Sequence, residues 1–94
     1  MTVRVWRYDV AADVREEFER EYGPDGSWAR LFAASPGFVG TSLYVDAGSS
    51  TSYLTVDRFV DEEAWRQFRT EHDAAYREVG ERLRHLTTVQ EELV

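Results

Sequence analysis

The stretch YLTVDRFVDEEAWRQF, residues 53–68, decides the fold. Its first part, residues 53–59, is rich in β-branched and aromatic residues and predicts a strand. Asp61 then begins a helix, because its side chain can accept a hydrogen bond from the first turn. Glu62 and Glu63 follow in that turn, where negative charge is favourable. The stretch therefore predicts a strand that passes directly into a helix, as in a mixed α+β domain.

The predicted helix carries a long apolar stripe. Its members lie three or four residues apart: Trp65, Phe68, His72, Tyr76, Val79, Leu83 and Leu86. This spacing predicts one helical face of about six turns packed on a sheet, or two helices with a break near residues 71–72. The other face is charged and is expected in solvent: Arg66, Arg69, Asp73, Arg77, Glu81 and Arg84.

The rest of the chain completes a recognisable order of elements. Alternating or β-rich segments predict strands at 2–10, 38–45 and 87–93, and amphipathic segments predict helices at 12–22 and 27–34. The order β-α-β-β-α-β, with a doubled first helix, is the split βαβ plan of ferredoxin-like domains. We therefore expect an α+β fold with a four-stranded antiparallel sheet and helices on one face. Residues 1–94 are expected to form a single domain.

The first strand indicates a homodimer. Val3 and Val5 lie on one of its faces, and Trp6, Tyr8 and Val10 lie on the other. Because both faces are apolar, we expect both to be buried. Helices on one side leave the other side for a second copy of the chain. A chain of 94 residues buries only about 60–65% of the surface that it exposes when unfolded. An interface with a second copy would bury more apolar surface and so stabilise the fold.

Composition excludes several function classes. The net charge of −7 disfavours nucleic acid and anionic membranes as partners. No apolar run reaches the length of a membrane span, and the N-terminus reads as a strand, so the cytoplasm is the expected location. The absence of cysteine excludes disulfides and thiolate zinc sites. We expect no metal and no cofactor.

Four residues are candidates for catalysis. His72 lies on the apolar stripe and has a side chain able to take a proton near neutral pH, and Tyr76 lies one turn further, where it can bind a quinone or phenolate oxygen. Asp57 and Arg58 interrupt an apolar strand. Asp57 is expected either to line a pocket with a raised pKa or to form an ion pair with Arg4 or Arg7.

Aromatic side chains are the candidates for substrate binding. Flat rings on helices that face the sheet suit planar ligands, and they equally suit a small core. The candidates are Trp28, Phe32, Tyr53, Trp65 and Phe68.

Three stretches carry a family resemblance: residues 22–32 (YGPDGSWARLF), residues 35–41 (SPGFVGT), and residues 53–59 followed by 61–68. Together they resemble the antibiotic biosynthesis monooxygenase domain. The resemblance implies a dimeric α/β barrel with a pocket in each subunit between sheet and helices. Some members oxidise aromatic polyketides with oxygen and no metal or flavin, and others degrade haem.

The resemblance also narrows the activity. The haem-degrading branch uses an asparagine, a tryptophan and a histidine, whereas this chain has no asparagine and places Phe68 and Glu78 at the other two positions. Haem degradation by that route is disfavoured. The expected function is a cofactor-independent monooxygenase acting on an aromatic polyketide-like or phenolic small molecule. The alternatives are a non-catalytic binding domain and a polyketide cyclase or isomerase.

Overall fold

The computed structural model describes residues 1–94, and strand pairing sets its architecture. Four antiparallel strands form one sheet in the order β2-β3-β1-β4, as the ferredoxin-like prediction requires. The elements are β1 (Thr2–Val10), η1 (Ala12–Val14), α1 (Arg15–Tyr22), α2 (Ser27–Phe32), β2 (Phe38–Asp46), β3 (Ser49–Phe59), α3 (Glu62–Glu71), α4 (Asp73–Leu83), η2 (Arg84–Leu86) and β4 (Thr87–Glu92).

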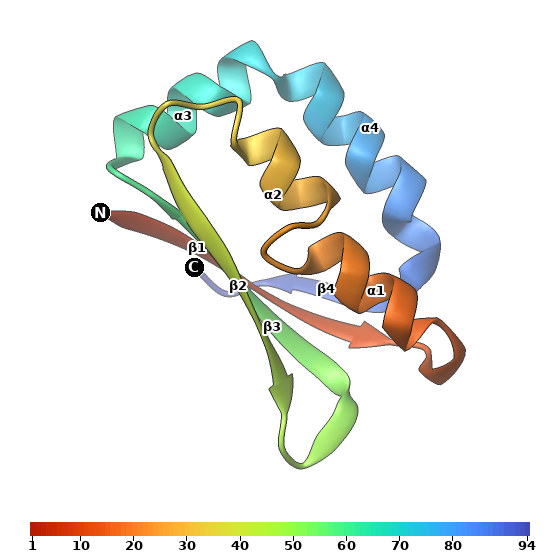
Figure 1. The fold of residues 1–94 in the computed structure, drawn as a ribbon. Coiled ribbons are helices and arrows are strands. Elements are labelled where there is room, and N and C mark those ends of the chain that lie inside the picture. The colour runs from red at the N-terminus through yellow and green to blue at the C-terminus, as the bar shows by residue number, and fades with distance from the viewer.

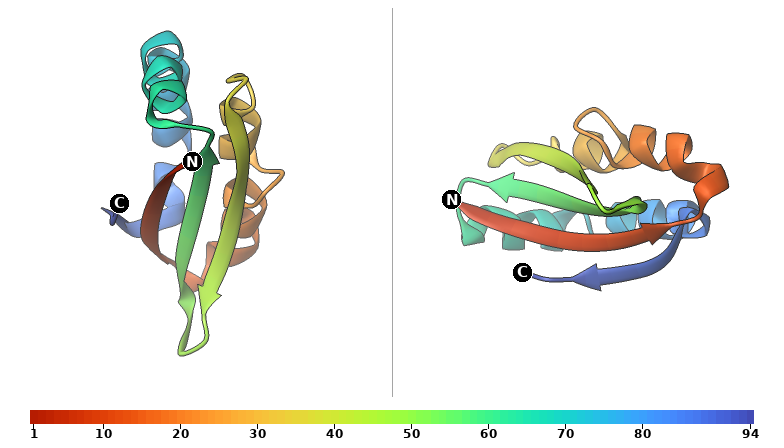
Figure 2. Two further views of the ribbon diagram at one scale, coloured as in Figure 1. Left: turned by 90° about the vertical axis from the view of Figure 1, so that its left-hand side faces the viewer. Right: turned by 90° about the horizontal axis from the view of Figure 1, so that it is seen from below.

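The helices all cover the same face of the sheet (Figure 1). The left view of Figure 2 looks onto the other face, over which no element of this chain passes. Along β3, the alternate residues Tyr53, Thr55, Asp57 and Phe59 are buried toward the helices. We call this side the inner face and the opposite side the open face.

The helical stripe is divided at His72, which confirms the two-helix alternative. α3 begins where Asp61 caps it, with the Ala64 N–H donating to Asp61 Oδ1 over 2.8 Å. His72 ends α3 and precedes α4, and its backbone is not helical. Its imidazole stacks on Phe68, with ring centroids 5.3 Å apart.

The β2–β3 hairpin is longer than the sequence predicts. The sequence predicts strands at 38–45 and 53–59, but β3 already begins at Ser49, where it pairs with Asp46. The turn is short because Asp46 Oδ1 accepts the Gly48 N–H over 2.7 Å and closes it locally. The serines and threonine that follow can then continue the strand pairing.

Two aromatic-rich clusters fill the space between sheet and helices. The first holds Tyr8, Val10, Phe18, Tyr22, Tyr53, Leu83 and Leu86. The second holds Phe32, Phe59 and Phe68. Trp28 of α2 packs against both clusters, so it marks the place where they meet.

Candidate functional site

A pocket of about 220 Å³ opens between the inner face and the helices. Its wall includes Tyr8 and Tyr22 from the first cluster, Phe32 from the second, and Trp28, which contacts both. The full lining is Trp6, Tyr8, Tyr22, Trp28, Phe32, Thr41, Thr55, Asp57, Arg69, Tyr76, Arg77, Gly80 and Gln90. The pocket is small for a ligand site, which suits a compact ligand.

Asp57 is the one carboxylate in the wall of the pocket. Its side chain accepts a hydrogen bond from the Thr41 hydroxyl over 2.7 Å, and no arginine forms an ion pair with it. Burial raises the pKa of Asp57 to about 6, although the Thr41 hydrogen bond and the charge of Arg58 oppose the rise. At neutral pH the carboxylate is therefore mostly ionised and is a stronger base than an exposed aspartate.

Tyr76 and Arg69 form a second polar element of the wall. The Arg69 guanidinium lies 3.9 Å from the centre of the Tyr76 ring, a close cation–π contact. Burial raises the pKa of the Tyr76 hydroxyl, and the negative charges of Glu92 and Asp57 add to the rise, while Arg69 and Arg4 lower it. The phenol therefore keeps its proton at neutral pH and can donate it in a hydrogen bond.

Burial acts in the same direction on the other two phenols of the wall. It raises the pKa of Tyr8 far above its usual range, and it raises the pKa of Tyr22. The indole N–H of Trp28 is near enough to the Tyr22 hydroxyl to lower that pKa in part, but it does not meet hydrogen-bond geometry with any acceptor. The wall thus combines neutral phenol hydroxyls and the guanidinium groups of Arg69 and Arg77 with a single carboxylate.

Comparison with known proteins places the chain in a family. The family model described as antibiotic biosynthesis monooxygenase matches residues 1–79. The chain belongs to the antibiotic biosynthesis monooxygenase family. No curated protein matched the sequence.

Solved structures of monooxygenases share the fold. SnoaB from Streptomyces nogalater, a cofactor-independent oxygenase crystallised as a mutant, is 25% identical, with a TM-score of 0.71 over 98% of this chain and 89% of that chain. A protein from Bordetella bronchiseptica with the same family name is 18% identical, with a TM-score of 0.70 over 98% and 95% of the two chains. One from Nitrosomonas europaea is 12% identical, with a TM-score of 0.70 over 97% and 84%.

Four of the residues proposed from the sequence lie together in the pocket of this family member. Asp57 and Tyr76 are the polar pair, and Trp28 and Phe32 are the aromatic pair. The ion pairs offered as the alternative for Asp57 do not form. Arg4 binds Glu62, and Arg7 binds Asp9 and Glu91.

The other five proposed residues are not in the pocket wall. Arg58 lies on the open face, where its Nη1 donates to Ser42 Oγ over 2.8 Å. His72 stacks on Phe68 at the junction of α3 and α4, and Trp65 packs in the second cluster. Tyr53 is buried, and its hydroxyl donates to Glu19 over 2.5 Å.

Sequence reasoning missed several members of the wall. Arg69 was expected in solvent, but the break at His72 turns α4 relative to α3, and Arg69 is half-buried over Tyr76. Arg77 also reaches the pocket, although its side chain is mostly exposed. Thr41 lies opposite Asp57 in the β2–β3 register, so correct strand pairing could have found it.

No group of three or more histidine, cysteine, aspartate or glutamate side chains is arranged to hold a metal ion. No helix has the length and apolar character that crossing a membrane requires.

Proposed function

We propose that this family member is a cofactor-independent monooxygenase for a compact phenolic or related aromatic molecule, with Asp57 as the base. One observation carries the proposal. Asp57 is only 7% exposed and forms part of the pocket wall, and its carboxylate has a hydroxyl but no cation as its partner. Family membership and the likeness to SnoaB support the reaction type.

The chemistry can be written with dioxygen as the only co-reactant. A methylene group conjugated to a phenol or ketone gives a proton to Asp57 and leaves a delocalised carbanion. The carbanion passes one electron to dioxygen, and the two radicals combine to form a carbon–oxygen bond. The peroxide takes a proton. The second C–H proton is then lost as the O–O bond breaks, which yields a new carbonyl and one water.

The side chains around Asp57 support this sequence of steps. The Tyr76 hydroxyl can donate a hydrogen bond to the oxygen on which the carbanion charge is delocalised. The rings of Trp28 and Phe32 can hold a planar ligand and keep water away from it. His72 and Arg58 are left out of the proposal because neither lines the pocket.

The test is oxygen uptake with anthrone-type substrates by wild type and by Asp57→Asn. We expect the substitution to lower kcat by about 10²–10⁴-fold, the usual contribution of a general base. In wild type, kcat/KM should rise with pH and level off above about 6, because the base must be ionised.

The matched control is Asp9→Asn on the open face, which should leave kcat unchanged. Equal oxygen uptake by wild type and Asp57→Asn would refute the catalytic role. A product of unchanged mass would point to a cyclase or isomerase, and binding without turnover would point to a binding domain.

We also propose that two copies pair through the open face. Several large apolar side chains are exposed on or beside it, among them Tyr44, Leu54, Val89 and Leu93. Their burial in a two-fold interface would add apolar contact that a chain of this size needs. Sedimentation equilibrium should give twice the mass of the chain, and a monomer at all concentrations would refute the pairing.

A further inference from the structure

The Asp57 carboxylate has one direct partner among the groups that surround it. Its Oδ1 accepts the hydrogen bond of the Thr41 hydroxyl over 2.7 Å, and no other hydrogen bond or ion pair of the protein reaches this side chain. Both residues are 7% exposed. A hydrogen bond from a hydroxyl to a carboxylate is a strong contact in such a place, because little water competes for it.

The second carboxylate oxygen, Oδ2, is unpaired and accessible. The protein has three side-chain atoms that combine the lack of a partner with almost no accessible surface: Arg4 Nε, Trp28 Nε1 and Arg69 Nε. Asp57 Oδ2 also lacks a partner but is not one of these three, so it keeps accessible surface. Because Asp57 lines the pocket, a ligand there can reach this oxygen.

An extra residue in β2 lies just before Thr41. Phe38 pairs with Phe59 on β3. The next pair joins Gly40 to Arg58, so Val39 has no partner and forms a β-bulge.

The bulge decides which side chain lies across from Asp57. Successive residues of a strand point to opposite faces, so one extra residue reverses the faces of all that follow. Regular pairing from Phe38 onward would put Gly40, which has no side chain, across from Asp57, and it would turn Thr41 to the open face. With the bulge, Thr41 is the register partner of Asp57 on the inner face. Bulges that redirect a side chain in this way are common beside active sites.

The other charged or titratable groups around Asp57 act only through space. The charge of Arg58, the next residue of β3, lowers the pKa of Asp57. The charge of Asp57 raises the pKa of Tyr8 in β1 and of Tyr76 in α4. The remaining groups are Arg4 bound to Glu62, Arg69 and Arg77 bound to Asp73, and Glu92 of β4, whose charge acts on Tyr76. Among all these neighbours, Thr41 alone holds the carboxylate by direct contact.

We propose that Thr41 is the positioning residue of the base, with its hydroxyl holding Oδ1 so that Oδ2 takes the proton of the substrate. The inference rests on the proposed function, in which Asp57 removes a proton from carbon. The C–H bond breaks, an O–H bond forms at Oδ2, and the electron pair stays in the delocalised carbanion. A free carboxylate turns easily about its Cβ–Cγ bond, so the hydrogen bond keeps Oδ2 directed at the reacting carbon.

Proton abstraction can be measured without dioxygen. Under anaerobic conditions in D2O, the methylene carbon of anthrone gives a proton to the base and receives a deuteron, and the deuterium content is followed by NMR. The pH at which the exchange rate rises reports the ionisation of the base. The plateau rate above that pH reports how well the ionised base is placed.

Thr41→Val keeps the shape of the side chain and removes the hydroxyl. The plateau rate should fall by about tenfold to a hundredfold, because the carboxylate is no longer held toward the carbon. The rise should move to higher pH by about one pH unit, because the hydrogen bond lowers the pKa of Asp57. Thr41→Ser keeps the donor and should restore most of both properties.

The matched control is Thr51→Val, the same change in β3 outside the pocket wall, which should alter neither the rise nor the plateau. If circular dichroism shows that Thr41→Val does not fold, Thr41→Ala replaces it with the same expectations.

The inference is overturned if Thr41→Val keeps the plateau rate of wild type, even when its rise is shifted, because Thr41 would then act on charge alone. A lower plateau that serine does not restore would also overturn it. Exchange that depends on Asp57 and Thr41, without oxygen uptake in air, would refute the oxygenase alone. Oxygen uptake that depends on Asp57 but not on Thr41 would refute this inference alone.

Discussion

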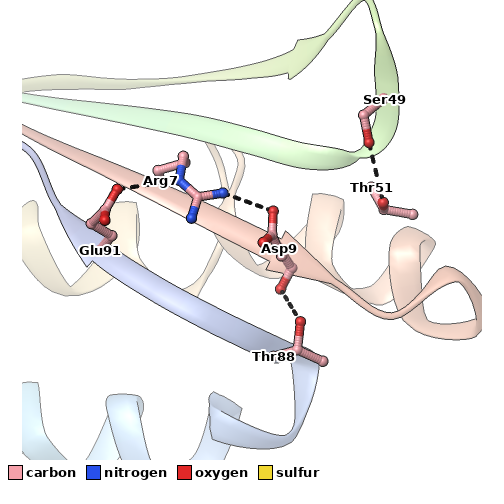
Figure 3. A network of polar contacts seen from close by, with 6 residues as sticks. All are labelled: Arg7, Asp9, Ser49, Thr51, Thr88 and Glu91. Carbon is pink, nitrogen blue, oxygen red and sulfur yellow. Dashed lines mark hydrogen bonds and ion pairs between the residues drawn. The ribbon is translucent and has the colours of Figure 1, made fainter.

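Two neighbouring charged residues of β3 point to opposite faces of the sheet and have very different surroundings. Asp57 points to the inner face, is 7% exposed and has only a hydroxyl partner. Arg58, the next residue, points to the open face and donates to Ser42. On β1, Arg7 binds both Asp9 and Glu91 on that same open side (Figure 3).

The difference shows that burial, and not charge alone, determines whether a charged side chain has a shifted pKa in this molecule. Arg7, Asp9 and Glu91 are partly exposed, so solvent screens their ion pairs and each contributes little to stability. Burial of Asp57 without a counter-ion raises its pKa and costs stability. The inner face therefore holds the reactive group, and the open face holds charges that suit a wet surface or the rim of an interface.

The largest expected effect is the loss of stability when a large side chain is removed from the core on the inner face. Phe59→Ala removes a side chain that is 0% exposed and that contacts Phe32, Trp65 and Phe68. We expect the free energy of unfolding to fall by about 3–5 kcal/mol, measured by urea denaturation. Val56→Ala on the open face of the same strand should cost less than half as much. Equal losses would contradict the division into a packed face and an open face.

Asp57→Asn sharpens the comparison because it should stabilise the protein while it removes activity. The folded-state pKa of Asp57 is raised to about 6 from 3.8, so the folded chain binds more protons between these values. The free energy of unfolding of wild type therefore falls as pH rises through this window and levels off above it. The variant lacks that loss and should be more stable at pH 7 by about 1–3 kcal/mol.

The measurement is urea denaturation of both proteins from pH 4 to pH 8, with the difference between them plotted against pH. Asp9→Asn, which removes a partly exposed ion pair, should lower stability by less than about 1 kcal/mol at pH 7. A difference curve for Asp57→Asn that is flat across the window would contradict the raised pKa.

Leu54→Arg tests whether the open face is the dimer interface. Leu54 lies on that face of β3 and is 37% exposed. In a proposed dimer, an unpaired charge at this place should weaken association by about tenfold to a hundredfold, seen in sedimentation equilibrium. The melting temperature of the variant should depend less on protein concentration than that of wild type. Arg66→Gln on the helix side is the control and should associate normally.

The smallest expected effect comes from Gly80→Ala in α4. Gly80 lines the pocket, and an added Cβ would lie 3.7 Å from the Trp28 ring, an ordinary contact. Alanine favours the helix by about 1 kcal/mol over glycine, so the melting temperature should rise by a few degrees. The same methyl group narrows the pocket and should weaken ligand binding in calorimetry. Tighter binding together with lower stability would contradict this placement.

Local patterns determined most of the fold from the sequence. Alternation along residues 53–59 and the Asp61 cap predicted β3 and the start of α3, because both depend on neighbours in the chain. The apolar stripe predicted one helical face of about six turns and left a break near residues 71–72 as the alternative, and the structure has the break. The hairpin was underestimated because its pairing depends on two strands at once.

The pocket needed the tertiary structure. Sequence placed Tyr76, Trp28 and Phe32 on faces directed at the core and gave a pocket as one of two alternatives for Asp57, and all four line one pocket. The sequence could not show that the partner of Asp57 is Thr41 and that Arg4 and Arg7 pair elsewhere. That outcome depends on which strands are adjacent and on the direction of each side chain. The sequence also placed Arg69 in solvent, because helical periodicity assumes that one axis continues through His72. Periodicity is a property of one element, whereas burial and charge pairing belong to several elements packed together.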